Sequence, residues 1–183
     1  MRVFFYIFLV SLISCKEPEA RPPVTVKTGT FFEESAARNR KILALEEEAI
    51  KKIMKKDTLN TYYTSASGFW YCYNVRDSIH GHTPAENDVV LINYNIRTLE
   101  NETLYTQAQI GDIRFKIDGE AAFTGLNTGL KLMKKGETVT FLFPSSLAYG
   151  YHGDGRKIGV NVPLISTVSL IDIIEKTNDS ISN

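Results

Sequence analysis

The chain has 183 residues, of which 43% are hydrophobic, and its 21 basic residues are balanced by 21 acidic ones. This length is enough for one domain with a core of its own and leaves room for further segments. The zero net charge argues against a nucleic-acid surface, which normally carries an excess of lysine and arginine. We therefore expect no nucleic-acid partner.

The N-terminus has the layout of a secretory signal. Arg2 precedes an apolar stretch that is too short to cross a bilayer as a helix, and Cys15 follows where this stretch ends. The residues Leu12–Cys15 resemble the lipobox of bacterial lipoproteins, in which the cysteine is lipidated and begins the mature chain. We predict a signal peptide over residues 1–14, a membrane anchor at Cys15 and a place in the cell envelope. An ordinary signal peptide with an incidental cysteine is the alternative.

A tether and a helix are predicted to follow. Residues 15–29 are rich in proline and charge, which is typical of an extended linker. Thr30 and Glu33 form a capping box, so a helical segment is predicted over residues 30–60, with the helix ending near Asp57. One face of this helix carries a stripe of apolar residues, which is expected to cover the chain's own domain or to pair with a second copy. Its apolar members at helical spacing are Ile42, Leu45, Ala49, Ile50, Ile53 and Met54.

From residue 61 onward the apolar pattern has a period of two, which is typical of strands. Phe123, Leu126 and Leu130 instead share one face of a short helix that is predicted to end near residues 134–136. Many strands around one short helix indicate an α+β fold in which an antiparallel sheet curves over the helix. The strands are predicted over residues 68–75, 88–99, 113–117, 139–143 and 164–174, with a short return at Leu104 and Tyr105.

The fold is assigned to residues 61–176, and residues 177–183 are predicted to be a disordered tail. Cys72 lies in the first strand, where alternation predicts a small buried thiol. If Cys15 is lipidated, Cys72 has no partner for a disulfide within the chain.

Polar motifs that would support metal or hydrolytic chemistry are incomplete. His80 and His82 lack a third and a fourth ligand at suitable spacing. The serines at 145–146, His152 and Asp154 contain the residue types of a hydrolase triad, but no G-x-S-x-G elbow is present. We therefore predict neither a metal nor a cofactor.

The remaining candidates are aromatic and apolar. Tyr94 and Phe115 occupy inward-facing strand positions, and Tyr149 lies where a strand has ended. These residues could simply fill a core, but two buried tyrosines need hydrogen-bond partners, and a glycine-rich loop covers a closed core poorly. We infer an open apolar bowl with a tyrosine hydroxyl at its rim, suited to a small apolar ligand that carries a carbonyl.

These segments are similar to the FK506-binding (FKBP) type of peptidyl-prolyl cis-trans isomerase. The resemblance covers about residues 66–176, and its most specific part combines GLKLMKKGE at 129–137 with PSSLAYG at 144–150. Together with the lipobox and the preceding helix, the chain resembles the gliding-motility-associated isomerase lipoproteins of Bacteroidetes. The resemblance implies a half-barrel sheet wrapped on one short helix, and prolyl isomerisation of polypeptide clients.

The resemblance also implies the residues of the site. In the family, the tyrosine of the AYG motif, here Tyr149, donates its hydroxyl to the substrate carbonyl, and the backbone N–H matched by Ile158 is a second donor. Tyr105 stands where the family usually has an aspartate, and Ser166 stands where an aromatic commonly closes the bowl. These replacements keep open the alternative of a non-catalytic binding module or chaperone. The implied lining is Tyr94, Leu104, Phe115, Phe123, Leu126, Tyr149 and Ile158.

Overall fold

The computed structural model describes residues 28–77, 81–119 and 123–174. Contacts divide the chain into two units, Met1–Ser35 and Ala36–Asn183. The second unit contains the sheet and the helix residues that pack on it. None of the described helices is both long enough and apolar enough to cross a membrane.

The described elements are three helices, one 3-10 turn and eight strands. The helices are α2 (Thr28–Lys56), α3 (Gln107–Ile110) and α4 (Thr124–Leu130), and the 3-10 turn η1 covers Ser145–Leu147. The strands are β1 (Tyr63–Thr64), β2 (Trp70–Val75), β3 (Val89–Tyr94), β4 (Ile96–Thr98), β5 (Thr103–Tyr105), β6 (Ile113–Lys116), β7 (Thr138–Phe143) and β8 (Leu164–Ile174). The predicted signal peptide, Cys15, the tether up to residue 27 and the tail lie outside the described residues.

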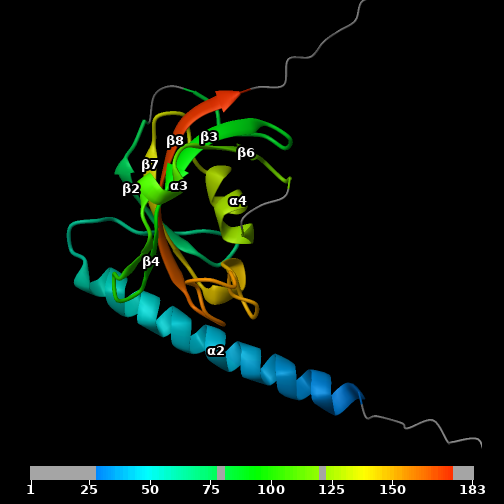
Figure 1. Cartoon of the computed structure of the whole chain (residues 1–183). Helices are drawn as coiled ribbons and strands as arrows, with labels where there is room; N and C mark the ends of the chain where they lie inside the picture. Colours follow the sequence, from blue (N-terminus) through cyan, green and yellow to red (C-terminus); the bar gives the residue numbers. More distant parts are fainter. Residues whose placement is uncertain (1–27, 78–80, 120–122, 175–183) are drawn as a thin grey trace, which may run out of the picture. The chain divides into compact units, whose positions relative to one another are not determined.

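The strands form one antiparallel sheet in the order β1-β2-β7-β8-β3-β6. The strand β8 pairs with β7, β3 and β4, so this single long strand joins both halves of the sheet. Figure 1 shows the sheet curving around α4, which lies against its concave face. This arrangement confirms the predicted α+β class with an antiparallel sheet wrapped on one short helix.

One predicted strand, over residues 88–99, is divided in the structure. β3 ends at Tyr94 and β4 begins at Ile96, and Asn95 between them bonds to β8 through its backbone N–H, which donates to the Thr167 carbonyl at 3.1 Å, and through two bonds that involve side chains. The Asn95 side-chain oxygen accepts the Thr167 N–H at 2.9 Å, and its carbonyl accepts the Ser166 hydroxyl at 2.7 Å. Asn93, in the same run, stays within β3, so the interruption comes from these contacts of Asn95 and not from asparagine as such.

Two predicted helix boundaries are wrong. The first helix begins at Thr28, two residues before the predicted capping box at Thr30. The short helix α4 ends at Leu130 and not near residues 134–136, because a turn replaces its last predicted residues. The buried Glu137 carboxylate accepts the Lys134 N–H at 2.8 Å and the Asp77 N–H at 3.1 Å, which fixes that turn to the end of β2.

The concave face of the sheet holds the main core, in which α4 lies close to β7. Gly129 faces the Phe141 ring, and a Cβ atom at Gly125 would lie 2.6 Å from the Phe143 ring. Glycine at these positions lets the helix approach the strand more closely than alanine would. Leu126 and Leu130, between and beside these glycines, are fully buried in the same cluster.

The convex face carries a smaller core built with the C-terminal part of α2. Ile50 packs there with Trp70, Leu142 and Ile165, so the predicted stripe packs against the chain's own sheet. The prediction for Leu45 is wrong, since this side chain is 60% exposed. Its neighbour Glu46 is 8% exposed and takes the inward position, because it lies on the face of the helix that is turned towards the sheet. The buried or partly buried residues of this face are 42, 43, 46, 49, 50, 53 and 54.

Cys72 lies on the convex face of β2, and it is a free cysteine that is 2% exposed. The prediction of a small buried thiol is therefore confirmed. Burial raises the pKa of this thiol, and the negative charge of Asp57 raises it further, although a hydrogen bond with Tyr62 acts in the opposite direction. A thiol with a raised pKa is a poor nucleophile at neutral pH.

Candidate functional site

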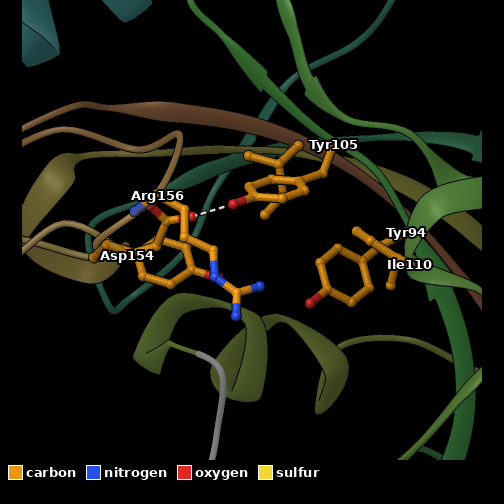
Figure 2. Close-up of a pocket in the computed structure, with 7 residues that line it drawn as sticks. Tyr94, Tyr105, Ile110, Asp154 and Arg156 are labelled. Atoms are coloured by element: carbon orange, nitrogen blue, oxygen red, sulfur yellow. Dashed lines mark hydrogen bonds between the residues drawn. The ribbon is translucent and has the colours of Figure 1, made fainter.

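A cavity of about 350 Å³ opens at the edge of the concave face. Strands β3, β4 and β5, helix α3 and the loop between β7 and β8 all contribute to its walls. Figure 2 shows side chains from these segments arranged around one space. The lining residues are Tyr94, Ile96, Tyr105, Ile110, Tyr149, Asp154 and Arg156.

Two tyrosine hydroxyls are available as hydrogen-bond donors in this cavity. Tyr94 directs its hydroxyl towards the middle of the space in Figure 2. Tyr149 packs its ring against Phe123, with 5.3 Å between the ring centroids. Neither hydroxyl bonds to another described residue of the protein. Burial raises the pKa of both phenols, and Tyr94, Asp154 and Tyr105 raise the pKa of Tyr149 further. Both groups therefore stay protonated at neutral pH and keep a proton to donate.

The position of Tyr149 is set by the turn that leaves β7. The Ser145 carbonyl accepts the Ala148 N–H at 3.0 Å and the Gly150 N–H at 2.8 Å, which are the amides on either side of Tyr149. The Tyr149 carbonyl accepts the Gly153 N–H at 3.2 Å. Gly153 has a φ of +65°, and a Cβ atom there would lie 2.3 Å from the Ile158 carbonyl oxygen. The loop therefore requires glycine at this position.

Asp154 organises the other wall of the cavity. One of its carboxylate oxygens accepts the Tyr105 hydroxyl at 2.5 Å, and the other accepts the backbone N–H groups of Arg156 and Ile158, both at 2.8 Å. Burial acts to raise the pKa of Asp154, but these donors outweigh it and hold the pKa below its usual value. The bond with Asp154 raises the pKa of Tyr105. This carboxylate has no spare proton and acts as a structural acceptor.

Two cations flank this wall. The Lys157 ammonium donates to the Leu104 carbonyl at 2.8 Å and lies 4.9 Å from the centre of the Tyr105 ring. Arg156 is exposed, and its side chain extends from the side of Asp154 towards Tyr94 in Figure 2. The guanidinium has no ion-pair partner among the described residues.

The structure brings the seven residues predicted for the bowl into one cluster. Tyr94 and Tyr149 line the cavity, whereas Phe115, Phe123 and Leu126 lie in the core next to it. Leu104 packs against the same core from its edge. The Ile158 N–H, predicted as a second donor, is already bonded to Asp154 within the protein.

Sequence reasoning missed five of the residues that line the cavity. Asp154 has a residue type found in hydrolase triads, and Tyr105 replaces an aspartate of the family pattern. Their 2.5 Å bond joins residues 49 positions apart, so no local pattern showed it. The missed residues are Ile96, Tyr105, Ile110, Asp154 and Arg156.

Comparison with known proteins identifies the domain. Residues 81–171 match the family model described as FKBP-type peptidyl-prolyl cis-trans isomerase. The chain belongs to the FKBP family. These residues run from before β3 to within β8 and include the whole lining of the cavity. The family assigned from the GLKLMKKGE and PSSLAYG segments is therefore confirmed.

Two related FKBP proteins from other bacteria are longer than this chain. A probable FKBP-type isomerase, FkpA, of Neisseria meningitidis is 31% identical over 128 residues, which are 69% of this chain and 44% of that protein. FkpA of Escherichia coli K12 is 33% identical over 113 residues, which are 60% of this chain and 39% of that protein. The chain thus spans less than half the length of these relatives.

Solved structures agree on the fold. The crystal structure of Escherichia coli FkpA aligns with a TM-score of 0.59 and 22% identity, covering 94% of this chain and 81% of that one. A peptidyl-prolyl cis-trans isomerase from Pseudomonas syringae aligns with a TM-score of 0.60 and 20% identity, covering 74% of this chain and 96% of that one. At these identities the alignments support the FKBP fold itself.

Proposed function

We propose that this protein is a peptidyl-prolyl cis-trans isomerase that acts on Xaa-Pro bonds of polypeptide clients. The observation that carries the proposal is the pair of tyrosines, Tyr94 and Tyr149, that line one open cavity and whose hydroxyls bond to no other described residue. Ile96, Ile110 and the Tyr105 ring supply the apolar part of the lining, and Asp154 and Arg156 supply its charged part. A proline ring would occupy the apolar part of this cavity, and the carbonyl of the preceding residue would accept a tyrosine proton. The family assignment supports the same reaction.

The chemistry of the reaction fits such a site. Rotation about a peptide bond is opposed by amide resonance, with a barrier of about 18–20 kcal/mol, and the bond to proline rotates in tens to hundreds of seconds. The planar amide is more dipolar than the twisted transition state, so water stabilises the planar form more. An apolar cavity removes that advantage, and a donor fixed at the carbonyl favours the twisted geometry. No bond is broken, which agrees with a site built mainly from aromatic and aliphatic side chains.

A proline-peptide assay tests the proposal directly. The purified protein should accelerate the cis-to-trans conversion of a short peptide with an apolar residue before proline. The rate should rise in proportion to protein concentration. If circular dichroism shows an intact fold and the rate equals the uncatalysed background, the proposed activity is wrong.

A non-catalytic binding module or chaperone on the same fold is the second candidate. The specific observation in its favour is that Asp154 already occupies the Ile158 N–H and the Tyr105 hydroxyl, which leaves fewer donors for a substrate. The variant Tyr149→Phe separates the two candidates. A catalyst should lose rate, whereas protection of an unfolded client from aggregation should not change.

Anchoring to a membrane is part of the proposal. Its support is the apolar leader that ends at Cys15 and the lipobox-like residues before it. Lipidation of Cys15 would hold the domain in the cell envelope, where it would assist the folding of exported proteins. The resemblance to gliding-motility lipoproteins suggests clients in such an apparatus.

In cells given a radioactive fatty acid, the wild-type chain should be labelled and Cys15→Ser should not. Equal labelling of the two proteins would contradict lipidation at Cys15.

A further inference from the structure

Glu46 is a buried acid that the proposed mechanism does not use. It lies on the inward face of α2 and is 8% exposed. Among the described residues it has no ion-pair partner. Burying a carboxylate without a counter-charge is unfavourable unless strong hydrogen bonds compensate for the lost water. A glutamate in this position therefore needs a specific partner.

That partner is Ser145, at the beginning of the turn that carries Tyr149. One Glu46 oxygen accepts the Ser145 backbone N–H at 2.8 Å, and the other accepts the Ser145 hydroxyl at 2.7 Å. Ser145 is itself 3% exposed, so both bonds lie away from solvent. Hydrogen bonds to an ionised group are among the stronger ones in proteins. The carboxylate thus holds one residue by two directional bonds.

The other side of Ser145 leads directly to Tyr149. The Ser145 carbonyl accepts the amides of Ala148 and Gly150, which flank Tyr149 in the chain. A short series of hydrogen bonds therefore runs from Glu46 through Ser145 to the two amides that flank Tyr149. Glu46 lies outside the cavity lining, so any effect on the site must act through this series.

We propose that Glu46 is a positioning residue that orients Tyr149 through Ser145, so that the N-terminal helix takes part in building the isomerase site. The effect on catalysis rests on the proposed function. The effect on the loop does not, because it follows from the hydrogen bonds alone. A donor is useful in catalysis only if it is oriented before the substrate arrives.

The first experiment measures the loop without using activity. Amide hydrogen exchange at Gly150 should be about tenfold faster in Glu46→Ala than in the wild type, because the Ser145 carbonyl that accepts this N–H is released. The increase at Ala148 should be smaller, because its N–H also donates to the Pro144 carbonyl at 3.2 Å. The matched control is Glu47→Ala. Glu47 is the next residue on the same helix and pairs with the exposed Lys51 at 3.1 Å. This control should leave both amides unchanged.

The second experiment measures the site with a double-mutant cycle. Glu46→Ala should lower kcat/KM about three- to tenfold, a loss no larger than that caused by Tyr149→Phe. In the Glu46→Ala background, Tyr149→Phe should add almost no further loss, because the hydroxyl is no longer in position. If the two losses multiply in the double variant, Glu46 is only a stability residue and the proposal is wrong.

Two milder variants cover the case in which Glu46→Ala does not fold. Glu46→Gln keeps an acceptor for the Ser145 N–H and should retain most of the rate and of the amide protection. Ser145→Ala removes only the hydroxyl bond and should give an intermediate loss of about two- to threefold. If the wild type proves inactive, the exchange data alone decide. Unchanged protection at Gly150 in Ser145→Ala, and in Glu46→Ala where that variant folds, would overturn the proposal.

Discussion

The two faces of the sheet are covered by helices in different ways. On the concave face α4 packs against a large apolar cluster, and its glycines bring its backbone close to β7. On the convex face α2 contributes a small apolar cluster around Ile50 and a buried carboxylate, Glu46. Apolar packing has no direction, whereas a hydrogen bond has one. The concave face therefore provides stability, and the convex face fixes the position of the loop that carries Tyr149.

The concave face should be the more sensitive to loss of volume. Leu126→Ala removes a fully buried side chain from the middle of α4, next to the cavity. The cavity left behind should lower the free energy of unfolding by about 2–5 kcal/mol. Urea denaturation with equal slopes for the two proteins would measure this loss. A change below about 1 kcal/mol would mean that α4 can move to fill the space, and that the close packing of this face is not rigid.

The convex face should lose somewhat less from an equivalent change. Ile50→Ala removes a side chain that is also fully buried, but α2 is a single outer helix and can shift towards the sheet. We expect a loss of about 2–3 kcal/mol, at the low end for such a substitution. In the same urea experiment, a loss larger than that of Leu126→Ala would reverse the ranking of the two faces.

Deletion of the N-terminal helix tests whether the concave face folds without the cover of the convex face. A fragment of residues 61–176 should keep the circular dichroism of the sheet, because the main core lies on its other face. Its melting temperature should fall, since Trp70, Leu142 and Ile165 lose the cover of Ile50. An unfolded fragment would show that the convex face is required for folding and does more than position a loop.

Removing the Tyr149 hydroxyl tests the site and not the packing. Tyr149→Phe keeps the ring on Phe123 and deletes one neutral hydrogen bond to the substrate. The rate should fall about three- to tenfold, which corresponds to about 0.5–1.5 kcal/mol, with little change in melting temperature. Tyr151→Phe is the control, since Tyr151 is 75% exposed. Equal losses of rate at both tyrosines would place the site elsewhere.

The smallest expected effect is that of pH. The pKa values of Tyr94, Tyr105 and Tyr149 are raised, so these groups stay protonated up to at least about pH 10. The pKa of Asp154 is lowered, so it stays ionised down to about pH 4. The rate, measured by NMR exchange of a proline peptide, should therefore be flat between about pH 5 and 9. A bell-shaped profile with a midpoint inside that range would mean that another group takes part.

Below this range the sign of the effect follows from Asp154. Its pKa is lower in the folded protein than in the unfolded chain, so the folded state favours the ionised form. The stabilisation that this provides is complete above the unfolded value of about 3.9 and is lost as the pH falls through the lower folded value. Because Asp154 is close to solvent, the accompanying fall in melting temperature should be small.

The sequence predicted those parts of the fold that rest on local periodicity. Alternation placed β8 over residues 164–174 with the bounds that the structure has, and it identified Cys72 as a buried thiol. The short helix α3 was missed although its signal is present. Thr106 and Gln109 form a capping box, and both reciprocal bonds are made.

The parts that could not be predicted depend on contacts between distant residues. Helical spacing predicts the buried face of a helix only broadly, so the pattern alone does not show whether Leu45 or Glu46 is buried. Glu46 is the buried residue because its carboxylate accepts hydrogen bonds from Ser145, which lies 99 positions away in the chain. The wall of the site depends in the same way on the bond from Tyr105 to Asp154. Local sequence patterns do not predict such contacts between residues that are far apart in the chain.

The burial of Cys72 gives the molecule a native reporter of motion. The thiol shares a hollow of the convex face with Ile53, Asp57 and Tyr62, at the C-terminal end of α2. Its raised pKa and its burial make it inert while the helix end is docked. A thiol reagent can reach Cys72 only when the C-terminal end of α2 moves away from the sheet. The rate of modification therefore measures how often this end of the helix opens. Opening of this end of the helix can thus be timed with a side chain that the protein already has.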